Sequence, residues 1–306
     1  MNNKGIFTPN FLILGTQKGG TSAINAYLSQ HPQICIPVRK EPSYFSFRGH
    51  HPCYSGPEDH LANQDFVTKD DAYAKLFAKK KTGQICGEGS VTYLYLAKTI
   101  ENIRAIAPKT KFIVSLRNPA DRAFSAYQHL RRDGREPLLD FEEALAAEQQ
   151  RITDNWETLW HYKEVGFYGK QIERYLEVFP RDQFLFLRSE DIRKDTVDAL
   201  KSCFVFLGVD ENIVPDTSYD MNVSGLPKNQ GLNNFLSKPS ALKSFIKNRI
   251  PLTLGRKIKS FIQRHNLERR EQLGHALRKR MLDEYKEDLK LAEKLTGLKL
   301  THWCDV

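Results

Sequence analysis

The stretch Phe11-Leu-Ile-Leu-Gly-Thr-Gln-Lys-Gly-Gly-Thr-Ser22 decides how this chain is organised. It begins as an apolar run, passes through a glycine-rich turn that contains Lys18, and ends in two hydroxyl side chains. The pattern predicts a buried strand, a tight turn and a helix that starts near Thr21. Glycines let backbone N–H groups converge on an anionic oxygen, the helix adds its positive dipole end, and lysine adds a full charge. The stretch therefore predicts a site for phosphate or sulfate.

The order of residues in this loop helps to distinguish between the enzyme classes that bind phosphate or sulfate groups. The phosphate loop of nucleoside-triphosphate enzymes reads Gly-x-x-x-x-Gly-Lys-Ser/Thr, with its lysine after the last glycine. Here Lys18 precedes Gly19 and Gly20. This order disfavours a P-loop-like kinase or nucleotide hydrolase. Such an enzyme, which would bind ATP and Mg²⁺, remains the alternative enzymatic interpretation.

A second informative block follows about a hundred residues later, Lys111-Phe-Ile-Val-Ser-Leu-Arg-Asn-Pro-Ala-Asp-Arg-Ala-Phe-Ser-Ala-Tyr127. Phe112–Leu116 is a continuous apolar run, which predicts a central strand, and Pro119 stands where a helix can begin. Arg117 at the strand end and Ser125 eight positions later can meet at one anion, because residues i, i+4 and i+8 lie near one helix face. The planar guanidinium of arginine suits a phosphate.

Two shorter motifs between these blocks carry acids. Lys40-Glu-Pro-Ser-Tyr-Phe45 places Glu41 before a proline, which favours an extended segment or a turn over a helix. Gly87-Glu-Gly-Ser90 contains Glu88. In open α/β sheets the ligands bind at the carboxyl ends of the strands, where we expect the first of these segments to lie. The alternative to a functional role is a solvated Lys-Glu pair for Glu41 and a buried structural carboxylate for Glu88.

These motifs occur in the order found in sulfotransferases that use 3′-phosphoadenosine 5′-phosphosulfate (PAPS), and the chain resembles the bacterial and heparan-sulfate-type branch of that family. The resemblance rests on the loop with lysine ahead of its glycines, Lys40-Glu-Pro-x-x-Phe45, Gly87-Glu-Gly-Ser90 and Arg117-Asn-Pro-x-x-Arg-x-x-Ser125-x-Tyr127. It covers roughly residues 10–235 and the last helix. One departure is Val91, which stands where the family usually has proline.

The resemblance implies a role for each motif. The phosphosulfate of the donor would be held by Lys18, Gly19, Gly20, Thr21 and Ser22, with Lys18 offsetting charge on the leaving oxygen. Arg117 and Ser125 would hold the 3′-phosphate, and Glu41 would take the proton of the acceptor. The late loop Asn222–Gln230 resembles the segment that closes over the nucleotide, with Ser224, Gly225 and Lys228 as its donors. A plain linker loop is the alternative for this last segment.

The acceptor side is less defined, and its candidate residues are Glu41, Glu88, Tyr44, His50 and Trp160. Ordinary core packing is the alternative for the aromatic region around Trp160. No metal is required, since the sulfuryl group carries less negative charge than a phosphoryl group and no carboxylate set for a divalent ion stands out. The acceptor would present a hydroxyl or an amine on a small metabolite or a glycan, with an acidic carrier protein as a further partner.

The alternation of strands and helices predicts an α/β fold, a P-loop-like open parallel sheet with helices on both faces. We expect one sulfotransferase domain over 1–306, made of a core at 10–236, a basic helical insertion at 237–270, and a C-terminal helix and tail at 271–306. Residues 48–70 lack hydrophobic periodicity and are expected to form a loop, whereas 141–150 is expected to be one amphipathic helix. The final helix is expected over about 270–295.

The composition is that of a globular protein, and the basic segment Lys238–Arg270 has more than one possible interpretation. With 306 residues, 40% of them hydrophobic and 27% charged, the chain has an ordinary globular composition. Ten basic residues against the single acid Glu268 give Lys238–Arg270 nine positive charges, equal to the net charge of the chain. A basic module that binds nucleic acid or acidic membranes is therefore the non-enzymatic alternative, although no nucleic-acid motif supports it. The absence of a membrane-length apolar stretch and of paired cysteines predicts a cytoplasmic protein.

Overall fold

The computed structural model describes residues 5–217 and 272–305. In this part of the chain a five-stranded parallel sheet has the strand order β2-β3-β1-β4-β5. The strands are β1 (Phe11–Gly15), β2 (Ile34–Cys35), β3 (Ile85–Gly89), β4 (Lys111–Leu116) and β5 (Phe184–Arg188). The apolar run that begins at Phe11 is thus the central strand, and the predicted open parallel α/β architecture is confirmed.

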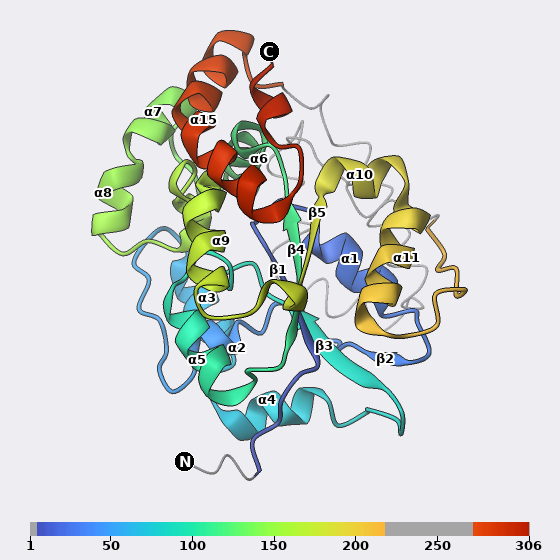
Figure 1. Cartoon of the computed structure of the whole chain (residues 1–306). Coiled ribbons are helices and arrows are strands. Elements are labelled where there is room, and N and C mark those ends of the chain that lie inside the picture. Colours follow the sequence, from blue (N-terminus) through green and yellow to red (C-terminus); the bar gives the residue numbers. More distant parts are fainter. Residues whose placement is uncertain (1–4, 218–271, 306) are drawn as a thin grey trace, which may run out of the picture.

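The sheet separates two hydrophobic cores, because successive residues of a strand point to opposite faces. Leu12 and Leu14 belong to the larger core, whereas Phe11 and Ile13 belong to the smaller one. In Figure 1 the two sets of helices lie on opposite sides of the sheet. The smaller core is covered by α1 (Thr21–Leu28), α10 (Ser189–Lys194) and α11 (Thr196–Leu207); the larger by α5 (Lys98–Ile106), α6 (Pro119–Arg132), α9 (Tyr168–Leu176) and α15 (His275–Thr296).

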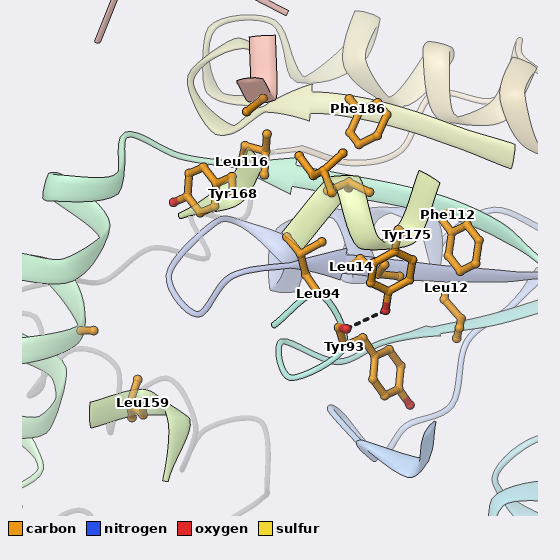
Figure 2. Close-up of a cluster of buried hydrophobic side chains, with 14 of the residues drawn as sticks. Leu12, Leu14, Tyr93, Leu94, Phe112, Leu116, Leu159, Tyr168, Tyr175 and Phe186 are labelled. Carbon is orange, nitrogen blue, oxygen red and sulfur yellow. Dashed lines mark hydrogen bonds between the residues drawn. The ribbon is translucent and has the colours of Figure 1, made fainter. Parts of the chain in front are cut away.

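The larger core is rich in aromatic side chains, several of which are drawn in Figure 2. Phe112 of β4 packs edge-on against Tyr175 of α9, with ring centroids 5.7 Å apart. Tyr175 donates its hydroxyl hydrogen to the carbonyl of Tyr93 at 2.6 Å, which satisfies a polar group inside the apolar cluster. This contact fixes α9 to the segment that follows β3.

The last helix completes the fold by capping another helix. Asp288 of α15 accepts hydrogen bonds from the backbone N–H groups of Gly169 (2.7 Å) and Lys170 (3.0 Å), which lie in the first turn of α9. A carboxylate at this position satisfies amides that have no partner within the helix and interacts favourably with its dipole. Tyr285 also donates to the carbonyl of Lys163 at 2.9 Å. The expected C-terminal helix is present, and it begins at His275.

Two of the expected element assignments are wrong. Residues 48–70 contain α3 (Asp59–Asp65), a short helix without apolar periodicity that depends on tertiary contacts of Asp59. The helix expected over 141–150 is split at Ala147 into α7 (Phe141–Ala146) and α8 (Glu148–Thr153).

The remaining short helices are α2 (Tyr44–Phe47), α4 (Asp70–Leu76), η1 (Thr158–Trp160), η2 (Glu164–Gly166), η3 (Arg181–Gln183) and η4 (Thr301–Cys304). The basic segment at 237–270 lies outside the described residues, so the proposed domain division stays a prediction.

A tight contact inside the sheet gives a test of this packing. A Cβ atom on Gly87 of β3 would lie 2.4 Å from the ring of Phe11, which is fully buried on β1. Gly87→Ala is expected to lower the free energy of unfolding by about 1–3 kcal/mol, because the ring has no room to move. Urea unfolding measures the change. Gly274→Ala, at a position where nothing lies within 4 Å of the added Cβ, is the control and should stay within about 0.5 kcal/mol. Equal effects of both changes would contradict the packing.

Candidate active site at the carboxyl edge of the sheet

The loop between β1 and α1 has a backbone that two glycines make possible. Gly20 precedes α1 with φ +97°, a conformation that favours glycine. At Gly19 a Cβ would lie 2.9 Å from the carbonyl oxygen of Thr16, which itself accepts the Gly19 N–H at 2.8 Å. Lys18 has a φ of +68°, a left-handed backbone conformation that residues with a side chain rarely adopt. The sequence thus folds here into a tight turn that leads directly into the N-terminus of a helix.

This loop is held by the neighbouring strand. The parallel register places Gly15 beside Ser115, the penultimate residue of β4. The Ser115 hydroxyl donates to the carbonyl of Gly19 at 2.8 Å, and Arg117 donates through Nη1 to the carbonyl of Lys18 at 3.0 Å. The two predicted anion-binding motifs therefore touch, although about a hundred residues separate them in the chain.

The helix that carries Ser125 starts where the sequence indicates. The Asn118 side chain accepts hydrogen bonds from the N–H groups of Ala120 and Asp121, both at 3.1 Å, and Pro119 occupies the first helical position. Both features stabilise a helix N-terminus. As a result α6 begins two residues after Arg117 and carries Ser125 to the same cavity wall.

One cavity of about 700 Å³ gathers most of the predicted site residues. Its walls include seven of them: Lys18, Gly20, Thr21, Ser22, Glu41, Arg117 and Ser125. Gly19 belongs to the same tight turn but is not among the residues that line the cavity. Two buried polar atoms of the wall residues, Gln17 Oε1 and Ser189 Oγ, have no hydrogen-bond partner among the described residues. A cavity lined by four cationic side chains (Lys18, Arg117, Arg135 and Arg193), several hydroxyls and unsatisfied polar atoms is suited to an elongated polyanion such as PAPS.

Glu41 lies on this cavity wall in a strained and well-supported backbone. Its φ is +49° and that of Ser43 is +50°, values that residues with a side chain rarely adopt. The Ser43 N–H donates to Ser90 Oγ at 3.0 Å, and the carbonyl of Pro42 accepts from the Val67 N–H at 2.9 Å. Such strained positions cluster at functional sites.

The surroundings of Glu41 tune its acidity. Burial and, next, the nearby Glu157 carboxylate raise the pKa of Glu41 to about 7, against the opposing effects of Lys40, the Val91 N–H and Lys18. A carboxylate with a pKa near 7 combines useful basicity with substantial ionisation at neutral pH. The geometry and the pKa together suit Glu41 to accepting a proton.

Glu88 lies behind this wall rather than on it. Its fully buried carboxylate accepts hydrogen bonds from Tyr93 (2.5 Å), Tyr73 (3.2 Å) and Ser90 (2.9 Å). Burial raises its pKa to about 7, although these hydroxyl donors oppose the rise. Since Ser90 also accepts the Ser43 N–H, Glu88 supports the backbone that presents Glu41.

The structure does not bring the other acceptor candidates to this cavity. Tyr44 is fully buried, stacks on Tyr73 and donates to Asp70 at 2.8 Å. Trp160 is fully buried and donates its indole N–H to Asp59 at 3.1 Å. His50 is exposed and lines a second cavity of about 920 Å³. These three residues are therefore ascribed to packing or to another surface. Ser224, Gly225 and Lys228 lie outside the described residues.

The sequence interpretation missed four ionisable residues that also line the cavity: His129, Arg135, Glu157 and Arg193. Arg135 Nη2 donates to Glu157 Oε2 at 2.8 Å and also contacts the buried Asp59. Asp59 is 76 positions away from Arg135 in the chain, and neither residue belongs to a local motif. No spacing signal in the sequence could have linked Asp59 and Arg135, because their contact forms only when the first residue of α3 meets the loop between α6 and α7.

The comparisons with known proteins agree with this geometry. A model of the sulfotransferase domain matches residues 8–274, and the chain therefore belongs to the sulfotransferase family, whose general donor is PAPS. The crystal structure of a sulfotransferase from Alicyclobacillus acidocaldarius superposes with a TM-score of 0.76 and 33% sequence identity, over 97% of this chain and 99% of that one. The protein is thus a sulfotransferase with the parallel-sheet fold of that structure.

Curated relatives include enzymes of heparan sulfate. The chain is 30% identical over 265 residues to human heparan sulfate glucosamine 3-O-sulfotransferase 6, covering 84% of this chain and 70% of the relative. It is 29% identical over 205 residues to human bifunctional heparan sulfate N-deacetylase/N-sulfotransferase 2, covering 66% of this chain and 22% of the relative. For the mouse 3-O-sulfotransferases 3B1 and 3A1, the match spans about half of their length.

The described residues, 5–217 and 272–305, contain no cluster of three or more histidine, cysteine, aspartate or glutamate residues arranged to hold a metal ion. None of the helices within these ranges has the length and apolar character needed to cross a membrane. The predicted cytoplasmic location stays a prediction.

The contacts of Glu88 lead to a prediction that separates support from direct participation. Glu88→Ala is expected to lower the free energy of unfolding by about 1–3 kcal/mol, since three hydroxyl groups lose their buried acceptor. Chemical denaturation measures this loss. Glu101→Ala, at an exposed position of α5, is the control and should leave stability nearly unchanged. Unchanged stability of Glu88→Ala together with lost sulfuryl transfer would instead indicate a direct contact with the acceptor.

Proposed function

We propose that this sulfotransferase moves the sulfuryl group of PAPS to a hydroxyl or amine of a carbohydrate or small-metabolite acceptor. The observation that carries the proposal is the single cavity that Lys18, Glu41, Arg117 and Ser125 share. One elongated donor with an anionic group at each end can therefore contact the turn after β1 and the start of α6 at once. Membership of the family supports this interpretation over a kinase or a basic binding module.

The donor would be oriented by its two anionic ends. The turn 18–22 and the N-terminus of α1 would hold the 5′-phosphosulfate, as glycine-rich turns that precede helices do. Arg117 and Ser125 would hold the 3′-phosphate, with the guanidinium supplying a fork of charged donors. The Arg117 side chain already contacts the carbonyl of Lys18, so both ends of the donor would be bound by one connected unit.

The reaction would be an in-line transfer. The acceptor oxygen or nitrogen forms a bond to sulfur while the bond between sulfur and the 5′-phosphate oxygen breaks, which leaves 3′,5′-adenosine bisphosphate. Glu41 takes the proton of the acceptor, and Lys18 offsets the negative charge that develops on the leaving oxygen. By analogy with phosphoryl transfer, positioning and charge stabilisation supply most of the rate enhancement. Proton transfer to a positioned base contributes roughly 10²–10⁴-fold.

The relatives favour a carbohydrate among the acceptor classes. The names of several curated relatives describe enzymes that act on heparan sulfate. A sugar offers both hydroxyl and amine groups as nucleophiles, and either would transfer its proton to Glu41. An acidic carrier protein and a small metabolite are the other partners that the sequence suggested.

The role of Arg117 can be tested by binding of the product nucleotide. Isothermal titration with 3′,5′-adenosine bisphosphate should show that Arg117→Ala weakens binding by roughly tenfold or more, because a charged hydrogen bond to the 3′-phosphate is lost. Arg104→Ala, at an exposed position of α5, removes the same charge away from the cavity and should bind like the wild type. Equal affinities of Arg117→Ala and the wild type would remove Arg117 from the donor site.

The role of Glu41 can be tested by its effect on turnover and on the pH profile. Burial raises the pKa of Glu41 to about 7, so protonation below that pH removes the base. We expect kcat/KM to rise with pH through a midpoint near 7 and then level off, and Glu41→Gln to lose transfer by roughly 10²–10⁴-fold.

Titration with 3′,5′-adenosine bisphosphate is the control for Glu41→Gln, whose nucleotide affinity should remain within about twofold of the wild type, because the substitution preserves shape and removes only the proton-accepting carboxylate. Near-normal turnover of Glu41→Gln would place the base elsewhere, with His129, which lines the same cavity, as the next residue to replace.

A further inference from the structure

The helix α10 forms a wall of the candidate donor site. β5 lies next to β4, and the register of the two strands pairs Arg188 with Leu116. The next residue of each strand, Ser189 and Arg117, therefore leaves the sheet at the same edge. Ser189 opens α10 beyond the end of β5 (Figure 1), and it lines the cavity of about 700 Å³ together with Arg193, one helical turn later. Residues four apart lie on one helix face, so this face of α10 belongs to the cavity wall.

The same face of α10 carries a polar group that needs a partner. The Ser189 side chain is buried, and its hydroxyl makes no hydrogen bond with any described residue. Gly20 of the predicted anion-binding turn is close by, since a Cβ atom on Gly20 would lie 3.7 Å from the Cβ of Ser189. Buried hydroxyl groups are rarely left without a partner. The wall that α10 forms is therefore suited to a polar ligand.

Arg193 lies where two cavities meet. A smaller cavity of about 370 Å³ borders the first, and three of the described residues line both: Arg117, Ser125 and Arg193. Arg117 and Ser125 are the pair that we assign to the 3′-phosphate of the donor, and both follow β4, whereas Arg193 follows β5. The junction of the two cavities is therefore bordered by two guanidinium groups that come from neighbouring strand–helix units.

The guanidinium of Arg193 has hydrogen-bond donors that the fold does not use. Its Nε donates to the carbonyl of Ser189 at 3.1 Å, which attaches the side chain to the first turn of α10. Within residues 5–217 and 272–305, Nη1 and Nη2 of Arg193 have no hydrogen-bond or ion-pair partner. A guanidinium that is held at Nε and keeps the N–H groups of both terminal nitrogens is suited to binding an oxyanion.

Other charged side chains around the smaller cavity are engaged elsewhere. Arg278 donates through Nε to Asp121 at 3.0 Å, so these two charges offset each other. Glu190, the acid next to Ser189 on α10, accepts the indole N–H of Trp303 at 2.9 Å and is thereby held by the C-terminal tail. Neither acid forms an ion pair with Arg193. The positive charge of Arg193 is therefore available to a ligand at the junction.

The charge of a phosphate monoester explains why one arginine is not enough. Such a group carries about −1.5 to −2 charges at neutral pH and presents three strong acceptor oxygens. Arg117 supplies one positive charge, and its Nη1 is already engaged by the carbonyl of Lys18. The Ser125 hydroxyl adds a donor without adding charge. A second guanidinium would offset the remaining charge and bind a further oxygen.

We infer that Arg193 binds the 3′-phosphate of the donor together with Arg117, and that it thereby selects PAPS over adenosine 5′-phosphosulfate, the same donor without that phosphate. This inference rests on the proposed function and adds to it a residue that determines donor specificity. The residue comes from α10, outside the two motifs that the sequence assigns to the donor.

Two nucleotides that differ only in the 3′-phosphate test the inference. Arg193→Ala should weaken the binding of 3′,5′-adenosine bisphosphate by roughly tenfold or more and leave the affinity for 5′-AMP within about twofold of the wild type, because the lost contact involves the 3′-phosphate alone. Titration calorimetry measures the first affinity, and displacement of the bisphosphate by 5′-AMP measures the second. An unchanged affinity for the bisphosphate, or an equal loss for both nucleotides, overturns the inference.

The neighbouring residue provides a matched control. Lys194 is also an exposed cation of α10, but it lines neither cavity. Lys194→Ala should bind both nucleotides within about twofold of the wild type, because an exposed charge outside the cavities is screened by water and salt. If Lys194→Ala weakened the bisphosphate as much as Arg193→Ala does, the effect would come from the general field of α10, and the inference would be overturned.

The wild type and Arg117→Ala separate this outcome from failure of the proposed function. A wild type that binds neither nucleotide would refute the donor site itself, and the inference with it. If the wild type binds the bisphosphate and Arg117→Ala weakens it while Arg193→Ala does not, the proposed function stands and only the role of Arg193 is refuted.

Discussion

The site depends on the attachment of one loop to the end of the neighbouring strand. Ser115 and Arg117 donate to the carbonyls of Gly19 and Lys18, so the turn after β1 cannot move independently of the start of α6. Parallel register makes this possible, since it brings Gly15 and Ser115 to the same edge of the sheet. Two binding elements that are far apart in the chain thus act as one rigid support, and a rigid support lowers the entropy lost when a flexible donor binds.

Residues that we assign to the reaction have strained backbone conformations. Lys18, Glu41 and Ser43 have positive φ values without being glycine, and each such residue costs of order 1 kcal/mol or more. The surrounding contacts offset this cost: Lys18 through its carbonyl to Arg117, Ser43 through its N–H to Ser90. The backbone strain at these positions is therefore offset by contacts within the fold, and the buried Glu88 contributes by binding the Ser90 hydroxyl that holds Ser43.

The sequence predicted those parts of the protein in which neighbouring residues act together. The turn at 15–22, the strand and helix around Arg117, and the parallel α/β class all follow from local pattern or motif order. The Asp59–Arg135–Glu157 cluster was not predictable, because its members come from three segments and are united only by tertiary packing. The same reason explains Tyr44 and Trp160, whose aromatic character fits a binding surface as well as a core until burial is known.

The cap that Asp288 places on α9 has a consequence for the order in which the protein is made. Ribosomes add about 5–20 residues per second, and the more than one hundred residues that separate Gly169 from Asp288 therefore take roughly 6–24 s to synthesise. Once β5 has been made, early in that interval, all five strands are available, whereas the first amides of α9 still lack their acceptor. The nascent chain should consequently linger as a nearly complete intermediate with an exposed aromatic face, the state in which a chaperone would be most useful.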